Sequence, residues 1–593
     1  MNFNQILLTF AMSIMALAGI NLSKASGGVF PLPLDPMVTG VNVYSVSDPL
    51  LTIGETIPGT SGELNSTTAG DYTPVGVLDG IGAYKLDRNI IRIFTNHELG
   101  NSVGNEYFVT DGPGNSGNSF SLVGARISYF DIHKETRQIV DGGIAYSTIY
   151  DANGQIAEDT TFLANNFPGF GRFCSGGLFE ANTFRKGNSR KIRGLENTIY
   201  FAGEEDGGSF NPVGGAEWAL DVENGDMWHL PALGRGAWEN ITLLDTGNTN
   251  EVAILLTDDT SPFDADGDGI REASPLYLYI GEKDPNGDFP ARNGLRGGKL
   301  YVWVSRTGER TPTNFNGSGS LQGDWVEIDN SQNLALADEF GANGFDEFGY
   351  PTQRNLWTQA EALGAFGFSR PEDVATNPRN GSEAVFASTG VDTYENGVDT
   401  FGTIYTITTN FNNLRSRLTI IYDGDADPAR ALRSPDNVDW ADNGFIYVQE
   451  DKAENQTLDG EALFGVGAVN PNEAGIVRLN PKNGSTLRVA NINRSVVLDG
   501  SIANPEDAVD RLANDAGEWE TSGILDVSKL FDEDRGTLLL FDVQAHGIQR
   551  QDAFNFDSRI NNADLFEGGQ LLFLELNNDR GGKDDDDQRK NKK

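Results

Sequence analysis

The sequence predicts an all-β protein in which small antiparallel sheets repeat around a common axis. Short apolar strands recur along the 593 residues, and each ends in polar or acidic side chains. Turn-forming pairs, such as Asn224-Gly225 and Asn443-Gly444, flank these strands. No long amphipathic helix lies between them. Radial repetition of this kind is typical of a β-propeller with loop insertions and a few short helices.

Six stretches carry the repeated pattern and are rich in residues that favour strands. They are Ile91–Phe94, Thr198–Phe201, Val252–Leu256, Ala384–Ala387, Phe445–Val448 and Leu538–Phe541. Equivalent strands of a propeller open toward one central channel, so we expect the polar residues at their ends to converge there. The metal-ligand candidates at these ends are Glu98, Glu205, Asp258 and Glu450. The alternative is that acidic strand ends favour only turns and solvent.

The remaining segments differ in composition. Residues 6–20 are almost wholly apolar and precede Ser23-Lys24-Ala25, which predicts a signal peptide over residues 1–25. An uncleaved anchor is the alternative, because no Lys or Arg precedes the apolar run. Residues 26–75 are expected to lead into a single propeller domain over residues 76–577. We expect a partly helical insertion near residues 329–369, with its helical signal at Ala360–Leu363, and a disordered charged tail over residues 578–593.

The formal net charge of −42 excludes some classes of binding partner. Such a surface repels nucleic acid and anionic membranes. An acidic chain can act on an anionic substrate only where bound cations reverse the local field. Export would place the protein in the periplasm or outside the cell. No stretch after the signal is apolar enough to span a bilayer, and we expect a monomer.

A calcium site is predicted at residues 264–272, where acidic side chains stand at alternate positions around glycines. The ligand candidates are Asp264, Asp266, Asp268 and Glu272. A complete EF-hand would carry a bidentate Glu at the twelfth position, which is Pro275 here. The self-contained loop predicts a structural calcium, and a polar hairpin loop is the alternative.

The chain has one cysteine, Cys174, so no intramolecular disulfide can form. A thiolate is a soft ligand that suits iron, zinc or copper. A buried inert thiol and a catalytic cysteine–histidine pair are the alternatives. In Arg370-Pro371-Glu372-Asp373, the arginine fork suits a phosphate oxygen and the glutamate suits a metal, unless the two form only a surface ion pair.

Five motifs, taken together and in order, resemble those of the PhoX-type alkaline phosphatases over about residues 75–575. They are Asn96–Glu98, Gly171–Gly176, Gly234–Glu239, Arg370–Asp373 and Ser434–Asn437. The resemblance implies a six-bladed propeller with an iron–calcium cluster in its channel. It implies that Cys174, Glu239, Glu372 and Asp436 are ligands, and that Arg370 contacts the phosphoryl group. Asn96, Arg370 and Glu372 are the catalytic candidates.

Two features depart from that family. Trp238 stands where a histidine is expected before the glutamate, which affects the shape of the substrate pocket, and no twin-arginine motif precedes the apolar run. The function expected is hydrolysis of small phosphate monoesters by an exported enzyme that uses calcium and iron. The alternatives are a calcium-dependent phytase-like or phosphodiesterase propeller and a non-catalytic, calcium-stabilised extracellular binding propeller.

Overall fold

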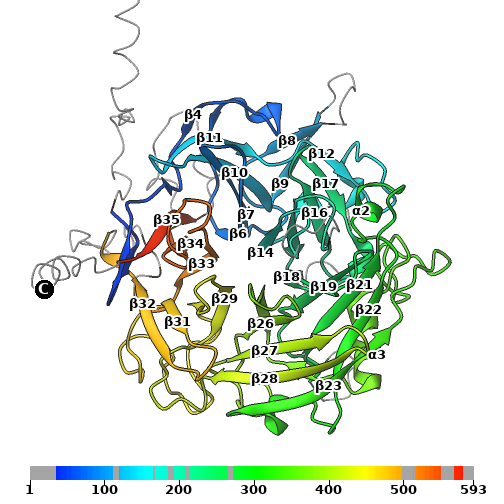
Figure 1. Cartoon of the computed structure of the whole chain (residues 1–593), viewed down its shortest axis with the longest axis vertical. Coiled ribbons are helices and arrows are strands. Elements are labelled where there is room, and N and C mark those ends of the chain that lie inside the picture. Colours follow the sequence, from blue (N-terminus) through cyan, green and yellow to red (C-terminus); the bar gives the residue numbers. More distant parts are fainter. Residues whose placement is uncertain are drawn as a thin grey trace, which may run out of the picture.

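Antiparallel sheets surround a central axis like the blades of a propeller (Figure 1), and two of the six blades are joined in one nine-stranded sheet. The computed structural model describes residues 35–110, 119–163, 167–184, 193–206, 213–264, 271–496, 510, 512, 514–548 and 567–577. Within these residues the blades follow one another around the ring in chain order. The all-β, six-bladed propeller that the sequence predicts is therefore confirmed.

The first three blades run outward from the channel in chain order. Blade 1 contains β6 (Leu78–Lys85), β7 (Ile90–His97), β10 (Arg126–His133) and β11 (Gln138–Ile144). Blade 2 contains β14 (Phe173–Phe179), β15 (Ile199–Glu204), β16 (Glu217–Asp221) and β17 (Asp226–His229), with β12 (Thr148–Tyr150) parallel to β17. Blade 3 contains β18 (Trp238–Leu244), β19 (Glu251–Asp258), β21 (Tyr277–Glu282) and β22 (Lys299–Ser305).

The other three blades complete the ring. Blade 4 contains β25 (Pro371–Thr376), β26 (Glu383–Ser388), β27 (Thr403–Asn410) and β28 (Arg415–Asp423). Strand β23 (Gly319–Ile328) pairs with both β22 and β28, and so joins blades 3 and 4 at their outer edges. Blade 5 contains β29 (Pro435–Trp440), β30 (Ile446–Glu450), β31 (Gly475–Leu479), β32 (Thr486–Ile492) and β1 (Val38–Gly40). Blade 6 contains β33 (Trp519–Asp526), β34 (Leu538–Ala545), β35 (Gly568–Leu576), β2 (Tyr44–Val46) and β3 (Leu51–Thr52).

Short elements decorate the ring. They are β4 (Ile57–Thr60) with β5 (Gly70–Tyr72), β8 (Tyr107–Thr110) with β9 (Ser119–Gly124) and β13 (Gly169–Phe170), β20 (Ser274–Pro275) with β24 (Gly367–Phe368), and helices α2 (Phe289–Arg292) and α3 (Gln353–Leu363). Helix α3 contains the helical stretch expected within the insertion. It begins at a Thr352 cap, whose side chain accepts from Asn355 N, and ends at the left-handed Gly364.

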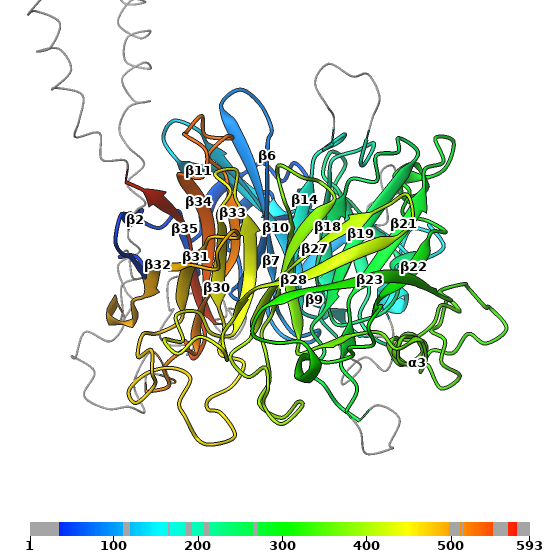
Figure 2. The same cartoon turned by 60° about the horizontal axis from the view of Figure 1, so that its bottom comes forward.

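N-terminal strands close the ring. Strand β1 pairs with β32 of blade 5 and β2 pairs with β35 of blade 6, beside which it lies in Figure 2. The buried Tyr44 hydroxyl of β2 lies 3.0 Å from that of Tyr447 in blade 5. Residues from the start of the chain therefore connect the last two blades.

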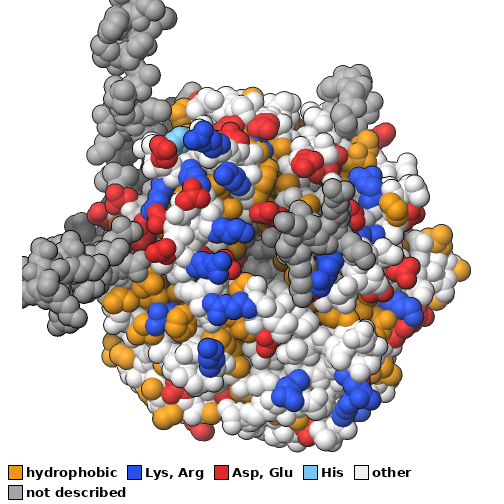
Figure 3. All heavy atoms as spheres, in the orientation of Figure 1, with side chains coloured by type: hydrophobic (Ala, Val, Ile, Leu, Met, Phe, Trp, Pro, Cys, Tyr) orange, Lys and Arg blue, Asp and Glu red, His pale blue; other side chains and the backbone are white. Residues whose placement is uncertain are grey.

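Apolar side chains fill the interfaces between blades, as the alternation along each strand requires. Phe94 of blade 1 packs against Tyr200 of blade 2 with ring centroids 5.5 Å apart. Figure 3 shows Lys and Arg side chains interspersed with Asp and Glu on the face seen in Figure 1, despite the net charge of −42.

The signal peptide and the charged tail lie outside the described residues, so both stay predictions. Among the helices of the described part of the chain, none combines the length and apolar character needed to cross a membrane.

Candidate metal centre

A cavity of about 260 Å³ lies where the innermost strands of the blades begin. Every residue that lines it is ionisable. They are Asp79, Glu98, Arg172, Cys174, Glu205, Glu239, Asp259, Arg370, Glu372, Asp436, Asp451, Glu520 and His546. If all nine carboxylates are ionised, they exceed the two guanidinium groups by seven negative charges. Such an excess of buried negative charge is unfavourable unless bound cations neutralise it.

Six side chains, here called the first ring, occupy one equivalent position in the six blades. Each is the second residue of an innermost strand: Asp79, Cys174, Glu239, Glu372, Asp436 and Glu520. In five of these strands, all but β33, the register shifts directly after the first residue, where the innermost strand holds one extra residue. Such a β-bulge re-aims side chains. Repetition of the bulge directs five of the six first-ring side chains into one cavity.

A second ring follows the second strand of each blade. It consists of Glu98, Glu205, Asp259, Thr389, Asp451 and His546. In the first five blades, the backbone N–H at this position donates to the carbonyl of the residue just before the innermost strand. Thr389 does not line the cavity, but its hydroxyl lies 2.8 Å from Glu372 Oε1 and orients that carboxylate. The two rings together supply most of the cavity wall.

The rings bring ligand atoms close enough to share cations. Three overlapping groups each place three such atoms within 4.8 Å of one another: Asp79, Glu98 and Cys174; Cys174, Glu205 and Glu239; and Glu239, Asp259 and Glu372. Cys174 and Glu239 each belong to two groups. The groups therefore form a continuous arc over blades 1 to 4.

Electrostatics within the arc are unfavourable without added positive charge. Burial raises the pKa of Asp79, Glu239 and Glu372 well above their usual range, and neighbouring carboxylates raise it further. Burial and then Asp79 likewise raise the pKa of the Cys174 thiol. The thiol donates to Asp79 Oδ2 at 3.3 Å. These groups are held protonated or share a cation.

Two arginines lie among the acidic groups. Arg370 donates to both oxygens of Asp259, from Nε at 2.9 Å and from Nη2 at 2.8 Å, and its Nη2 lies 2.9 Å from Glu372. Arg172 pairs with Glu98 at 2.5 Å and also with Glu205. The two guanidinium groups neutralise part of the arc and leave the remainder for cations.

His546 lies in the other half of the cavity, over blade 6. Its Nε2 donates to Glu520 at 3.2 Å and its Nδ1 donates to Glu567. Burial alone would lower the pKa of His546, but these two carboxylates hold it well above its usual value. The two carboxylates therefore favour the protonated imidazole, the form in which His546 adds positive charge to blade 6.

The structure brings most of the predicted site residues together and displaces others. Cys174, Glu98, Glu205, Glu239, Glu372, Asp436 and Arg370 all line the cavity. Asp258 and Glu450 do not, and for these two the prediction is wrong by one residue. Each is the last residue of its strand, so its side chain points away from the channel, whereas the next residue faces it.

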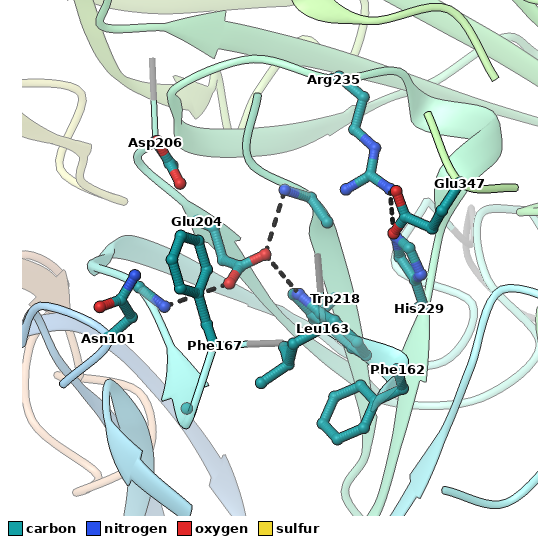
Figure 4. Close-up of a pocket in the computed structure, with 13 residues that line it drawn as sticks. Asn101, Phe162, Leu163, Phe167, Glu204, Asp206, Trp218, His229, Arg235 and Glu347 are labelled. Carbon is teal, nitrogen blue, oxygen red and sulfur yellow. Dashed lines mark hydrogen bonds and ion pairs between the residues drawn. The ribbon is translucent and has the colours of Figure 1, made fainter. Parts of the chain in front are cut away.

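Both displaced carboxylates have structural partners. Asp258 accepts from Trp357 Nε1 at 2.9 Å and from Gln353 Nε2 at 3.0 Å, and so anchors α3. Glu450 pairs with Arg488 at 2.7 Å and with Arg433 at 3.4 Å. Figure 4 shows Glu204 in a separate pocket with Trp218. The adjacent Glu205 lines the central cavity, so the same alternation holds there.

Asn96 is fully buried and does not line the cavity, which corrects its assignment as a catalytic candidate. Its Nδ2 donates to the carbonyls of Cys174 and Ser175, at 2.8 and 3.0 Å, and its Oδ1 accepts from the Tyr200 hydroxyl at 3.0 Å. Asn96 therefore holds the bulge that aims Cys174 at the cavity.

The predicted calcium loop stays a prediction. Asp266 and Asp268 lie outside the described residues. Asp264 is described, and Glu272 forms an antiparallel bridge with Phe263, so the two ends of the loop lie side by side.

Sequence reasoning missed Asp79, Arg172, Asp259, Asp451, Glu520 and His546. Asp259, Asp451 and His546 carried a usable signal, because each directly follows an apolar strand. Asp79 and Glu520 are the second residues of innermost strands, and Arg172 directly precedes such a strand. Only the register of the strands identifies these positions as part of the cavity wall.

The fold and the cavity define an all-β propeller protein with an acidic, thiol-containing centre suited to cations. Residues 222–507 match the family model of Alkaline phosphatase PhoX. The resemblance that the motifs carry to the PhoX-type alkaline phosphatases is thereby confirmed over that segment, and the match supports a phosphatase.

One solved structure supports the fold. Pseudomonas fluorescens PhoX, in complex with vanadate, a transition state analogue, superposes with a TM-score of 0.55 at 14% identity, over 91% of this chain and 96% of that chain. A family AA12 carbohydrate-active enzyme of Trichoderma reesei, in its calcium structure, gives a TM-score of 0.27 at 9% identity over 72% and 96%. No curated protein matches the sequence.

Proposed function

We propose that this chain is an exported, metal-dependent phosphatase that hydrolyses phosphate monoesters at the channel centre. One observation carries the proposal: the cavity is lined by ionisable side chains alone, with a carboxylate–thiol arc beside two arginines. An anionic ester cannot approach nine carboxylates unless cations reverse the field. A non-catalytic propeller would need neither the thiol nor the arginines.

The arc fits a mixed cluster of calcium and iron. Calcium takes six to eight hard oxygen ligands, which neighbouring carboxylates provide. The Cys174 thiolate suits iron. Glu239 Oε2 is buried, and within the described residues it has no hydrogen-bond partner. A buried oxygen without a partner is expected where a cation binds. Asp79, Glu98, Glu205, Asp259 and Glu372 would complete the ligand set.

Bound cations would act as Lewis acids that neutralise phosphoryl oxygens. The chain itself supplies orientation and a charged donor. Arg370 lies at the edge of the arc with 17% of its side chain exposed, so its fork can reach a phosphoryl oxygen and stabilise charge that builds up there. Thr389 fixes Glu372 beside it.

Two further points support the proposal. The PhoX relative is known in complex with vanadate, which its description calls a transition state analogue. Export to the periplasm or beyond is supported by the apolar stretch at residues 6–20, and action as a monomer is part of the proposal.

The test is a substrate panel with metal analysis. Purified protein loaded with calcium and iron is assayed on a phosphate monoester, a diester and an inositol phosphate. We expect monoester turnover, a fall in kcat/KM of about 100-fold or more in Arg370→Gln, and loss of iron in Cys174→Ala. Arg306→Gln is the matched control, because Arg306 pairs with Asp324 on an outer strand far in sequence from the rings.

Other outcomes assign another function. Preference for the diester or inositol phosphate would favour the phosphodiesterase or phytase-like alternative. Calcium binding that Cys174→Ala leaves unchanged, with no turnover of any ester, would favour a binding propeller and overturn the proposal.

A further inference from the structure

Arg172 and Arg370 occupy equivalent places in blades 2 and 4. Each directly precedes the innermost strand of its blade. Each has a left-handed backbone, with φ of 40° and 65°. Each carbonyl accepts the N–H of the second-ring residue of its blade, Glu205 or Thr389. The same backbone therefore presents two arginines to one cavity.

This backbone is a property of the propeller, and the side chain is what differs. Val77 and Ser434 take the same left-handed conformation just before β6 and β29, with φ of 53° and 40°. Left-handed φ is uncommon for residues other than glycine and costs free energy at each site. The left-handed backbone does not require arginine. The presence of arginine at two of these positions therefore points to a role for its side chain.

The ion pairs of the two arginines also correspond. Arg172 pairs with Glu98 of the preceding blade and with Glu205 of its own. Arg370 pairs with Asp259 of the preceding blade and with Glu372 of its own. Each arginine thus bridges two carboxylates of the arc. Arg172 joins blades 1 and 2, and Arg370 joins blades 3 and 4.

Arg172 retains capacity for another acceptor. Its Nε is buried and has no hydrogen-bond partner within the described ranges. Its side chain is 40% exposed, more than the 17% of Arg370, so a ligand that enters the cavity can reach it. A partly exposed guanidinium at the wall of the cavity is suited to a phosphate oxygen.

We infer that Arg172 is a second phosphate-binding residue, which binds the phosphoryl group from the side opposite Arg370. The inference rests on the proposed phosphatase function and narrows its substrate class. A monoester presents three non-esterified oxygens, whereas a diester presents two. Two arginine forks beside a cation cluster provide donors for all three, so this arrangement selects a terminal phosphate.

The experiment measures phosphate affinity apart from turnover. The apparent Ki of inorganic phosphate and the KM for a monoester are compared in metal-loaded wild type, Arg172→Gln, Arg172→Lys and the control Arg306→Gln. Metal content is measured in each sample. A charge-assisted fork is expected to be worth about 10- to 100-fold in affinity. Arg172→Gln should raise Ki and KM by that factor at unchanged metal content, and Arg172→Lys should fall between.

Two results would overturn the inference. One is a Ki in Arg172→Gln equal to that of wild type. The other is loss of metal in parallel with any rise in Ki, because Arg172 would then serve only the ligands Glu98 and Glu205. If Arg172→Gln does not fold, Arg172→Lys alone decides by the same two criteria.

Direct calorimetric binding of inorganic phosphate separates this inference from the proposed function. Phosphate binding that weakens in Arg172→Gln, in a protein that turns over no ester, would support the arginine pair and refute the phosphatase. Monoester turnover together with phosphate binding that is unchanged in Arg172→Gln would support the phosphatase and refute the arginine pair.

Discussion

Adjacent residues have different roles at this centre, because side chains alternate between the two faces of a strand. Asp258 lies at the end of β19 and accepts from α3, whereas Asp259 faces the cavity and pairs with Arg370. The same division separates Glu450 from Asp451. A one-residue difference therefore decides whether a carboxylate holds the fold or binds a ligand.

Asp258→Asn and Asp259→Asn should have opposite effects. An amide at Asp258 would place its N–H₂ among donors from Gln353 and Trp357, which should lower the free energy of unfolding by about 1–3 kcal/mol. Metal content should stay the same. Asp259→Asn should instead lower metal content and activity with little loss of stability. Denaturant unfolding and elemental analysis of both variants check this, and equal metal loss in both would contradict it.

Asn96 offers a second test, as a positioning residue. Asn96→Ala removes the amide that clamps Cys174 and Ser175, so buried carbonyls lose their donor. We expect a loss of about 1–3 kcal/mol in unfolding free energy, together with weaker iron binding because the thiol is no longer aimed. Asn412→Ala, in an exposed turn, is the control. Full iron binding by a destabilised Asn96→Ala would show that Asn96 supports the fold but not the thiol.

At the scale of the element, the repeated bulge explains what sequence reasoning could and could not provide. Apolar strands with turn pairs predicted the propeller, because that pattern is local. Cys174 and Glu372 were found because their motifs are distinctive. Asp79 and Glu520 were missed, because a carboxylate at the start of a strand looks like any other until the register is known. Asp258 was chosen over Asp259 for the same reason: the strand end is uncertain by a residue.

The closing strand makes a prediction about an element. Tyr44 of β2 is 3% exposed and its hydroxyl meets that of Tyr447 across the junction of blades 5 and 6. Tyr44→Ala should cost about 3–5 kcal/mol, as for other large buried aromatic side chains. The neighbouring Val43 is 50% exposed, so Val43→Ala should be nearly neutral. Thermal unfolding compares them, and equal midpoints would mean that β2 does not stabilise the ring.

At the scale of the whole molecule, the propeller concentrates negative charge where its six blades meet. Innermost strands from residues 78 to 526 each contribute a side chain to one cavity. The fold therefore holds together carboxylates that would repel one another, and the free energy for this comes from apolar burial between the blades. Cations should bind most strongly where that repulsion is greatest, in the arc shared by Cys174 and Glu239.

Stability should consequently depend on pH in opposite ways with and without metal. Unfolded Asp and Glu titrate near pH ~4, whereas burial and neighbouring carboxylates raise the pKa of Asp79, Glu239 and Glu372 well above that in the folded chain. Above pH ~4, the folded metal-free protein therefore holds protons that the unfolded chain has released, so its free energy of unfolding falls as pH rises.

Divalent cations replace those protons and should reverse the trend. At a calcium concentration of 100 Kd, binding adds about 2.7 kcal/mol, and it strengthens as the carboxylates ionise. Urea unfolding at pH 5.5 and 8, with calcium or with a chelator, measures both slopes. Glu239→Gln removes one shared ligand whose pKa is raised, so its metal-free slope should be shallower than that of wild type, which separates the cavity from the surface carboxylates. Equal slopes in the two proteins would mean that the cavity does not couple protonation to folding.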